Sequence, residues 1–298
     1  MSHISLSTAP NRHRPRILRV GRGPDTPPGA PSSHTPTAPM SLAARAVYPS
    51  QPTPLRSHLD DLLGQVPTRD ADDGVLVGLI VPDSNRTSGG AAAAQAYALL
   101  RGLEVETAIV ISPSHHGNFG RLSICQTDSY HTPIGEVVVN DHLRNELCDE
   151  DDDIYVDDTG HYHTEGADVQ LPFLLRSLEG DFDAVPIVMG EESPAFCREL
   201  GAAVGEVMHG RRSVVVGSCD VLEADADGLG KLQAAIEAFD ESTLMHLLGS
   251  EAVRVEGMGS LITTLIAAKR RGAKRAEVLV LEGATEDAPG ALSVALWR

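Results

Sequence analysis

The strongest restriction on the fold comes from short apolar runs that alternate with segments of helical spacing. The runs of strand length lie at residues 74–82, 105–113, 183–190, 212–220, 276–283 and 290–297. Helical spacing occurs at 57–66, 88–102, 166–178, 192–208, 227–249 and 258–271. Two more strands, within 120–127 and 135–140, are expected to flank the turn "HTPIG". This alternation predicts one α/β domain with a central, largely parallel or mixed sheet, flanked by helices on both faces.

Polar side chains follow several of these predicted strands, where a sheet of this kind binds its ligands. Asp83 comes directly after the first run, and the stretch "SPSHHGNFG" places His115 and His116 after the second. The run at 212–220 ends in Cys219 and Asp220, with Glu223 three residues further on. A neutral imidazole binds Zn or Fe and can act as a general base. A hydrogen-bonded structural histidine explains the same pattern equally well.

Three other stretches contain candidate site residues. In "GHYHTEGADVQLPF", His161 and Glu165 precede a predicted helix. Two roles are open: the two side chains form a proton relay, or the Glu165 carboxylate only complements the helix dipole. Glu256, in "VEGMGSL", caps the next helix or binds a cation. In "VVVGSCDV", Cys219 could act as a nucleophile only with an adjacent base. Asp220, as a metal ligand or a general base, is therefore the better candidate for a functional residue in this stretch.

Charge limits the partners that this chain is expected to bind. The formal net charge is -18, and the first 40 residues carry five Arg and one Asp. Residues 41–298 therefore hold 24 − 5 = 19 basic and 42 − 1 = 41 acidic side chains. Such a surface repels nucleic acid and anionic membranes, so neither is an expected partner. The acidic charge is instead expected either to favour cationic ligands or to be an adaptation of the surface to a solvent of high salt concentration. No apolar run has the length of a transmembrane helix, and four cysteines without a CxxC pair indicate reduced thiols in a cytoplasmic protein.

Residues 1–40 differ in composition from the rest of the chain. They are rich in Ser, Thr, Pro, Gly and Arg. We expect this tail to be disordered, or to precede the true start of the protein at Met40. Residues 41–298 form the predicted α/β domain.

Several stretches, in this order, resemble the Memo-like family, also called AmmeMemoRadiSam system protein B. They include "LIVPDSNRTSGGAAAAQAYALL", "VISPSHHGNFGRLSICQTDSYHTPIGEVVVN", "GHYHTEGADVQLPFLLRSL", "VVVGSCD" and "EGMGSLITTLIAAKRRG". The resemblance covers about residues 45–298. It implies a fold similar to class III extradiol dioxygenases, which use non-haem Fe(II), and a vestibule of His, Asp and Cys residues that binds copper or iron.

The chain departs from the family pattern at the implied metal site. His115 and His161 match family histidines and Asp220 matches a family aspartate, but Asp83 stands where the family has a histidine and Glu256 where it has a cysteine. A second family histidine has become Glu223, and the family's Glu-His-Ser has become Thr164, Glu165 and Gly166. Asp83, His115 and Glu256 would form a set that suits Fe(II), Mn(II) or Mg(II) rather than Cu(I).

Two functions remain open on this basis. The first is a metal-dependent, non-haem oxidoreductase of unknown substrate, with Fe(II) or another divalent ion at Asp83, His115 and Glu256. His115, His161 and Asp220 are then its catalytic residues, and His116, Glu165, Cys219 and Glu223 are secondary candidates. The second is a non-catalytic protein without a metal that binds a small molecule or peptide in the same cleft.

Overall fold

The computed structural model describes residue 49 and residues 51–68, 74–84, 87–148, 153–161, 166–250 and 252–298. The predictions for the tail at 1–40 and for Glu165 lie outside the described residues. Within the described part, no helix has the length and apolarity needed to cross a membrane.

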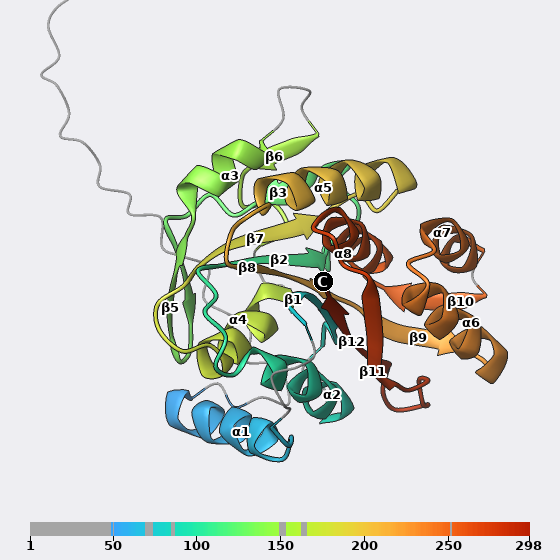
Figure 1. The fold of residues 1–298 in the computed structure, drawn as a ribbon, viewed down its shortest axis with the longest axis horizontal. Helices are drawn as coiled ribbons and strands as arrows, with labels where there is room; N and C mark the ends of the chain where they lie inside the picture. Colours follow the sequence, from blue (N-terminus) through green and yellow to red (C-terminus); the bar gives the residue numbers. More distant parts are fainter. Residues whose placement is uncertain are drawn as a thin grey trace, which may run out of the picture. The chain divides into compact units, whose positions relative to one another are not determined.

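Four parallel strands form the centre of the sheet, in the order β1, β8, β2, β7 (Figure 1). They are β1 (Leu76–Val81), β8 (Ser213–Ser218), β2 (Thr107–Pro113) and β7 (Asp183–Met189). Nearly every residue in them is buried, because helices cover both faces, and this explains their continuous apolar runs. The parallel order brings the carboxyl ends of all four strands to one edge of the sheet.

Further strands, mostly antiparallel to their neighbours, extend the sheet on both sides. Next to β1 lie β12 (Gly290–Trp297), which also pairs with β11 (Arg275–Leu281), then β9 (Asp220–Ala224) and β10 (Val253–Glu256). Next to β7 lie β3 (Leu122–Ile124) and β6 (Ile154–Val156), and the hairpin of β4 (Ser129–Thr132) and β5 (Gly135–Val139) also pairs with β7. The sheet is therefore mixed, with a parallel centre.

Two apolar cores lie on the two faces of the sheet. One face packs against α3 (Asp141–Leu147), α5 (Pro194–Val207), α6 (Ala226–Glu237), α7 (Glu241–Gly249) and α8 (Met258–Arg270). The other packs against α1 (Pro52–Gly64), α2 (Thr87–Tyr97) with the 3-10 turn η2 (Ala98–Leu100), and α4 (Gly166–Ser177). Figure 1 shows α1, α2 and α4 on the opposite side of the central strands from α5 and α8.

Two expectations about elements were wrong, and several short elements were missed. The single helix at 227–249 is two helices, because Phe239 adopts a positive φ of 50° and Asp240 begins α7 by accepting from the amide of Thr243. The strand within 120–127 is β3, which pairs with β7 and β6, and the strand opposite β5 across the turn is β4. The missed elements are the short strands β4, β6, β9 and β10 and the short helix α3.

Candidate functional site

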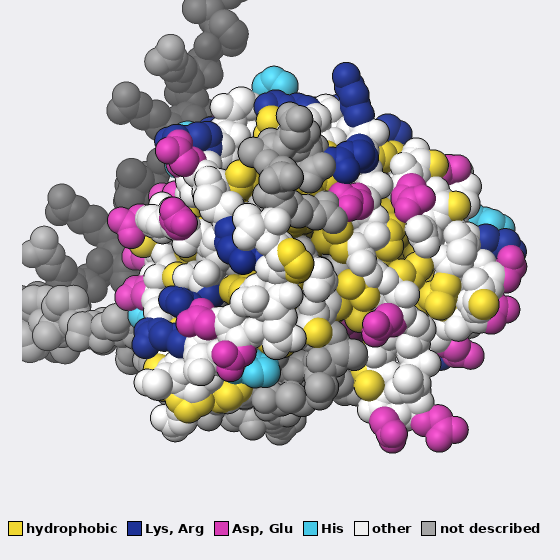
Figure 2. Space-filling view, turned by 60° about the horizontal axis from the view of Figure 1, so that its bottom comes forward, with side chains coloured by type: hydrophobic (Ala, Val, Ile, Leu, Met, Phe, Trp, Pro, Cys, Tyr) yellow, Lys and Arg dark blue, Asp and Glu magenta, His cyan; other side chains and the backbone are white. Residues whose placement is uncertain are grey.

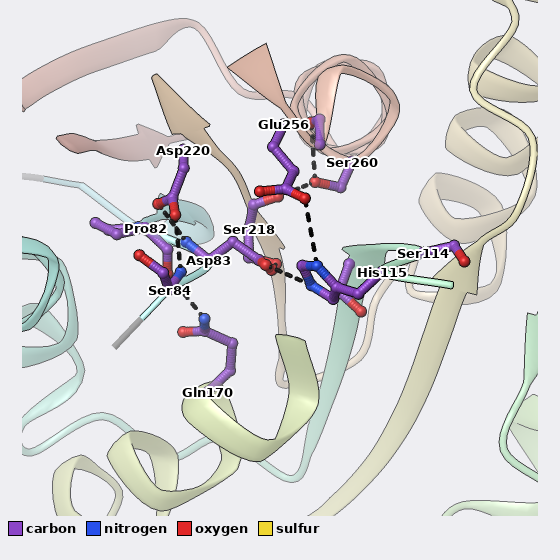
Figure 3. A network of polar contacts seen from close by, with 12 residues as sticks. Pro82, Asp83, Ser84, Ser114, His115, Gln170, Ser218, Asp220, Glu256 and Ser260 are labelled. Atoms are coloured by element: carbon purple, nitrogen blue, oxygen red, sulfur yellow. Dashed lines mark hydrogen bonds and ion pairs between the residues drawn. The ribbon is translucent and has the colours of Figure 1, made fainter. Parts of the chain in front are cut away.

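The candidate site lies at the carboxyl ends of the central strands, where four segments distant in sequence meet (Figure 3). Asp83 and Ser84 follow β1, His115 follows β2, and Ser218 is the last residue of β8. Glu256 ends β10, just before α8. The parallel pairing of β1, β8 and β2 brings the first three segments together. The pairing of β10 with β9 adds the fourth.

His115 lies between two carboxylates. Its Nε2 is 2.8 Å from Asp83 Oδ2, and its Nδ1 is 3.4 Å from Glu256 Oε1. Figure 3 shows that the two contacts reach different nitrogens of the ring. Exposure increases along the row, from 1% for the Asp83 side chain to 16% for His115 and 43% for Glu256. The contact with Asp83 is close but poorly aligned, since neither His115 Nε2 nor Asp83 Oδ2 makes a hydrogen bond within the described part.

The two carboxylates determine the charge of the ring. Burial alone would lower the pKa of His115, but its contacts with Asp83 and Glu256 outweigh burial and raise that pKa from 6.5 to about 10. At neutral pH the imidazole is therefore positively charged, with a proton on both nitrogens. The cluster is a carboxylate–imidazolium–carboxylate row with a net charge of −1.

Asp83 is held in place from several sides. The Ser218 hydroxyl donates to Asp83 Oδ1. The carboxylate of Asp220 accepts from the amide nitrogens of Asp83 and Ser84, at 3.0 and 3.2 Å. Burial raises the pKa of Asp220 to about 6, and the charge of Asp83 adds to the shift. Asp220 is thus a positioning residue that fixes the turn after β1, and Gln170 supports that turn by donating to the Pro82 carbonyl at 2.9 Å.

The turn between β10 and α8 needs a glycine. Gly257 has φ 82°, and a Cβ at this position would lie 2.5 Å from the Ser218 carbonyl oxygen. The Ser260 hydroxyl, in the first turn of α8, donates to the same carbonyl. These contacts pack the start of α8 against the end of β8, which fixes Glu256 beside His115.

An open cleft of about 400 Å³ adjoins this row of charges. Its walls are the loops after β2 and β7 and the turn before α8, including Glu256 itself. Glu191 lines the cleft, and its carboxylate accepts from the Asn118 side chain at 2.7 Å and from the Ser193 amide at 2.9 Å.

Glu192 also lines the cleft, and its Oε1 is buried without a hydrogen bond within the described part. Burial, together with the charges of Asp83 and Glu256, raises the pKa of Glu192 to about 7.

Four other candidates lie among the described residues: His161, Cys219, His116 and Glu223. His161 is buried, its Nε2 lies 3.1 Å from the Ser123 carbonyl, and burial lowers its pKa to about 4. Cys219 is fully buried, which raises its pKa well above the usual value and makes the thiol a poor nucleophile.

Two candidates are exposed. His116 is exposed next to His115. Glu223 is exposed and forms an ion pair of 3.0 Å with Arg254.

Comparison with known proteins identifies the family. A family model described as Memo-like protein matches residues 39–289. The chain belongs to the Memo-like family. A MEMO1 family protein of Methanopyrus kandleri is 27% identical over 250 residues, which cover 78% of this chain and 87% of that protein. A MEMO1 family protein of Sulfolobus acidocaldarius is 31% identical over 204 residues, which cover 65% of this chain and 72% of that protein.

Among solved structures, an uncharacterized protein of Escherichia coli K12 has a TM-score of 0.52 at 15% sequence identity. The match covers 74% of this chain and 99% of that chain. At this identity the similarity concerns the fold alone. The predicted Memo-like membership and the α/β fold with a mixed sheet are thus confirmed, whereas the link to extradiol dioxygenases stays a prediction.

The metal that the Memo-like resemblance implies requires donor atoms that face one point. Asp83 and Glu256 instead contact opposite nitrogens of the His115 ring. Among the described residues, no group of three or more His, Cys, Asp or Glu side chains is arranged to hold a metal ion. As they lie, these residues do not fit the ion, and metal binding stays a prediction.

Sequence reasoning missed part of the site in this Memo-like protein. Glu191 and Glu192 directly follow the predicted strand at 183–190, so their position at a strand end was a usable signal. Ser218 and Ser260 carried no such signal, because a serine in a buried strand or helix is indistinguishable by pattern from one that supports a neighbouring site.

Proposed function

We propose that this Memo-like protein is a binding protein for a small organic cation, an amine with an apolar body, in the cleft next to His115. The observation that carries the proposal is the charge of the cleft walls. Glu191, Glu192 and Glu256 line it, and His115, the one cation beside it among the described residues, contacts two carboxylates.

The charges favour a cation over an anion or a neutral molecule. The row of Asp83, His115 and Glu256 has a net charge of −1, and Glu191 adds another negative charge. Glu192 has a pKa of about 7, so a cation nearby would favour its ionised form. Its buried Oε1 also lacks a hydrogen-bond donor within the described part, and a ligand ammonium group could supply one.

The remaining walls suit an apolar body on the ligand. Pro113, Met189 and Met258 line the cleft between the acidic side chains. Methionine side chains adapt their shape to an aromatic or aliphatic group. A volume of about 400 Å³ lies within the range of small-molecule sites.

Calorimetric titration with phenethylamine tests this proposal, with 2-phenylethanol and phenylacetate as the neutral and anionic counterparts. We expect saturable binding of the amine and at least about tenfold weaker binding of the other two. Glu256→Gln and Glu192→Gln should each weaken amine binding by about fivefold, since each removes one negative charge. Glu223→Gln, outside the cleft, is the matched control and should bind as the unmodified chain does. Equal affinity for the amine and the alcohol would overturn the proposal.

The metal-dependent oxidoreductase remains the second candidate because of one observation. Asp83 Oδ2 and His115 Nε2 are buried, 2.8 Å apart and without an aligned hydrogen bond, a separation that two donors to one ion also show. Titration of the chelator-treated protein with Fe(II), Mn(II) and Zn(II) separates the two candidates. Stoichiometric binding that both His115→Ala and Asp83→Asn abolish would favour the metal. We expect no such binding.

A further inference from the structure

A second cavity, of about 540 Å³, lies at the opposite edge of the sheet from the cleft. Its walls include the starts of β1 and β8, the segment between η2 and β2, the residues after α5 and α8, and the end of β12. Because the central strands are parallel and about 20 Å long, their amino-terminal ends lie roughly that far from His115. This cavity is therefore separate from the candidate site.

Arg271 forms the innermost charge of this cavity. Its side chain donates to the Val77 and Ser213 carbonyls, both at 2.8 Å, across the starts of β1 and β8. The residue is only 8% exposed, and no carboxylate of a described residue lies within ion-pair distance. Burial lowers the pKa of Arg271 to about 10, and the neighbouring Arg298 adds to the shift. A helix C-terminus, as at the end of α8, offers about half a negative charge, so this cation is incompletely compensated.

Two more arginines line the cavity without a carboxylate partner among the described residues. Arg101 donates to the carbonyls of Ala98 and Val66, at 3.1 and 2.9 Å. Arg298 lies beside Arg271, and its side chain makes no ion pair within the described part. Three arginines that form no ion pair with a described side chain are unexpected at one cavity in a chain with a net charge of -18.

The remaining charges at this cavity are already matched. Arg211 forms an ion pair of 3.3 Å with Glu146, and Arg212 pairs with Glu104 and Glu106. Among the described residues, the five arginines, the three glutamates paired with two of them and the terminal carboxylate of Arg298 give a net charge of 5 − 3 − 1 = +1. Figure 2 shows Asp and Glu side chains scattered over one face of the molecule rather than gathered there into a patch. A local excess of positive charge thus stands out against a dispersed negative surface.

Apolar side chains make up much of the remaining wall. Val75 is 51% exposed and Leu103 is 36% exposed, although large apolar side chains are usually buried. Trp297 also lines the cavity. A ligand that covered these side chains would remove apolar surface from water while its charged group neutralised the arginines.

We propose that this cavity binds a small organic anion, with its carboxylate or phosphate group at Arg271 and Arg298 and its hydrocarbon body against Val75, Leu103 and Trp297. Arginine donates well to both kinds of anionic group. A carboxylate and a phosphate ligand would therefore use the same arginines, and a binding experiment decides between them.

Tryptophan fluorescence of the full chain tests the proposal, because Trp297 is the one tryptophan in the sequence. The probes are octanoate and octyl phosphate, with octanol and octylamine as the neutral and cationic counterparts. We expect a saturable change in Trp297 emission with one or both anions, and binding of octanol and octylamine at least about tenfold weaker. The preferred anion identifies the ligand class.

Variants show where the anion binds. Arg298→Gln should weaken binding by about fivefold, and the effect should shrink as salt is added. Arg270→Gln is the matched control, because Arg270 precedes Arg271 on α8 but does not line the cavity. Arg101→Gln tests the opposite wall without disturbing the Arg271 contacts. Equal binding of octanol and the anions, no saturable signal, or the same loss in Arg270→Gln as in Arg298→Gln would overturn the proposal.

Discussion

His115 contacts one carboxylate at each ring nitrogen, and the strength of each electrostatic interaction depends on how exposed that carboxylate is. Asp83 is buried. The Ser218 hydroxyl donates to its side chain and the Asp220 carboxylate accepts from its amide, so its charge acts on the ring in a region with little water. Glu256 is 43% exposed, so solvent screens part of its charge and a ligand in the cleft can reach it. The buried partner holds the ring, and the exposed partner faces the cleft.

The residue scale gives a prediction for stability against pH. The folded-state pKa of His115 is raised from 6.5 to about 10, so its contribution to stability is complete below pH 6.5 and is lost as pH rises towards 10. Raised pKa values of about 7 for Glu192 and about 6 for Asp220 act in the same direction at lower pH. Urea unfolding should show a free energy of unfolding that falls with rising pH over this window.

A histidine substitution isolates the part due to His115. His115→Asn should flatten the decline between about pH 7 and 10, because the charged ring is gone. His142→Asn, at an exposed histidine on α3, should leave the decline unchanged. A decline of the same slope in His115→Asn would contradict the assigned charge state.

At the scale of elements, the turn between β10 and α8 joins the fold to the site. Gly257→Ala should destabilise the protein, because the left-handed backbone costs about 1–2 kcal/mol for an L-residue and the new Cβ meets the Ser218 carbonyl oxygen at 2.5 Å. Gly180→Ala is the control, since Gly180 has φ 88° but no atom within 4 Å of its Cβ position. Urea unfolding of both variants separates backbone strain from the clash. Equal losses would contradict a role for the close approach.

The central elements were predictable from sequence because their signals are long and unmixed. β1, β2, β7 and β8 are buried on both faces, so each reads as a continuous apolar run. β10 is short and carries Arg254 and Glu256, and such a segment has no strand signature of its own. The break at Phe239 depends on one backbone angle, to which apolar periodicity is insensitive.

The candidate site was predictable in position but not in geometry. Strand ends and family motifs singled out Asp83, His115 and Glu256, and the structure brings these three into contact. The pattern could not show that the carboxylates face opposite ring nitrogens, because side-chain direction after a strand is set by turns such as Gly257. His161 was singled out by the same reasoning, and its ring packs against the Ser123 carbonyl instead.

At the scale of the whole molecule, the same parallel strands carry polar groups of opposite sign at their two ends. β1 and β8 end at Asp83 and Ser218 beside the acidic cleft, and they begin at the carbonyls that Arg271 binds. The two proposed sites therefore share strands, and the ligands that we propose for them have opposite charges. A cation in one and an anion in the other can be tested independently.

The net charge of the chain gives a prediction for the effect of salt. With a formal charge of -18, acidic side chains repel each other more strongly in the folded state than in the expanded chain. Raising NaCl from about 10 to 150 mM shortens the screening length from about 30 to 8 Å. The melting temperature should rise by about 2–4 °C for each kcal/mol of repulsion removed. KCl should act equally, and a constant or falling melting temperature would contradict this expectation.

The proton count on His115 tests the central claim most directly, because a ring held between two carboxylates differs from a metal ligand in this respect. Long-range proton–nitrogen NMR spectra of ¹⁵N-histidine-labelled protein at pH 8, assigned with His115→Asn, report both ring nitrogens. The account predicts an imidazolium with Nδ1 and Nε2 both protonated, and retention of that state when Zn(II) is added. A neutral ring with one unprotonated nitrogen, or a nitrogen shifted by bound zinc, would contradict it.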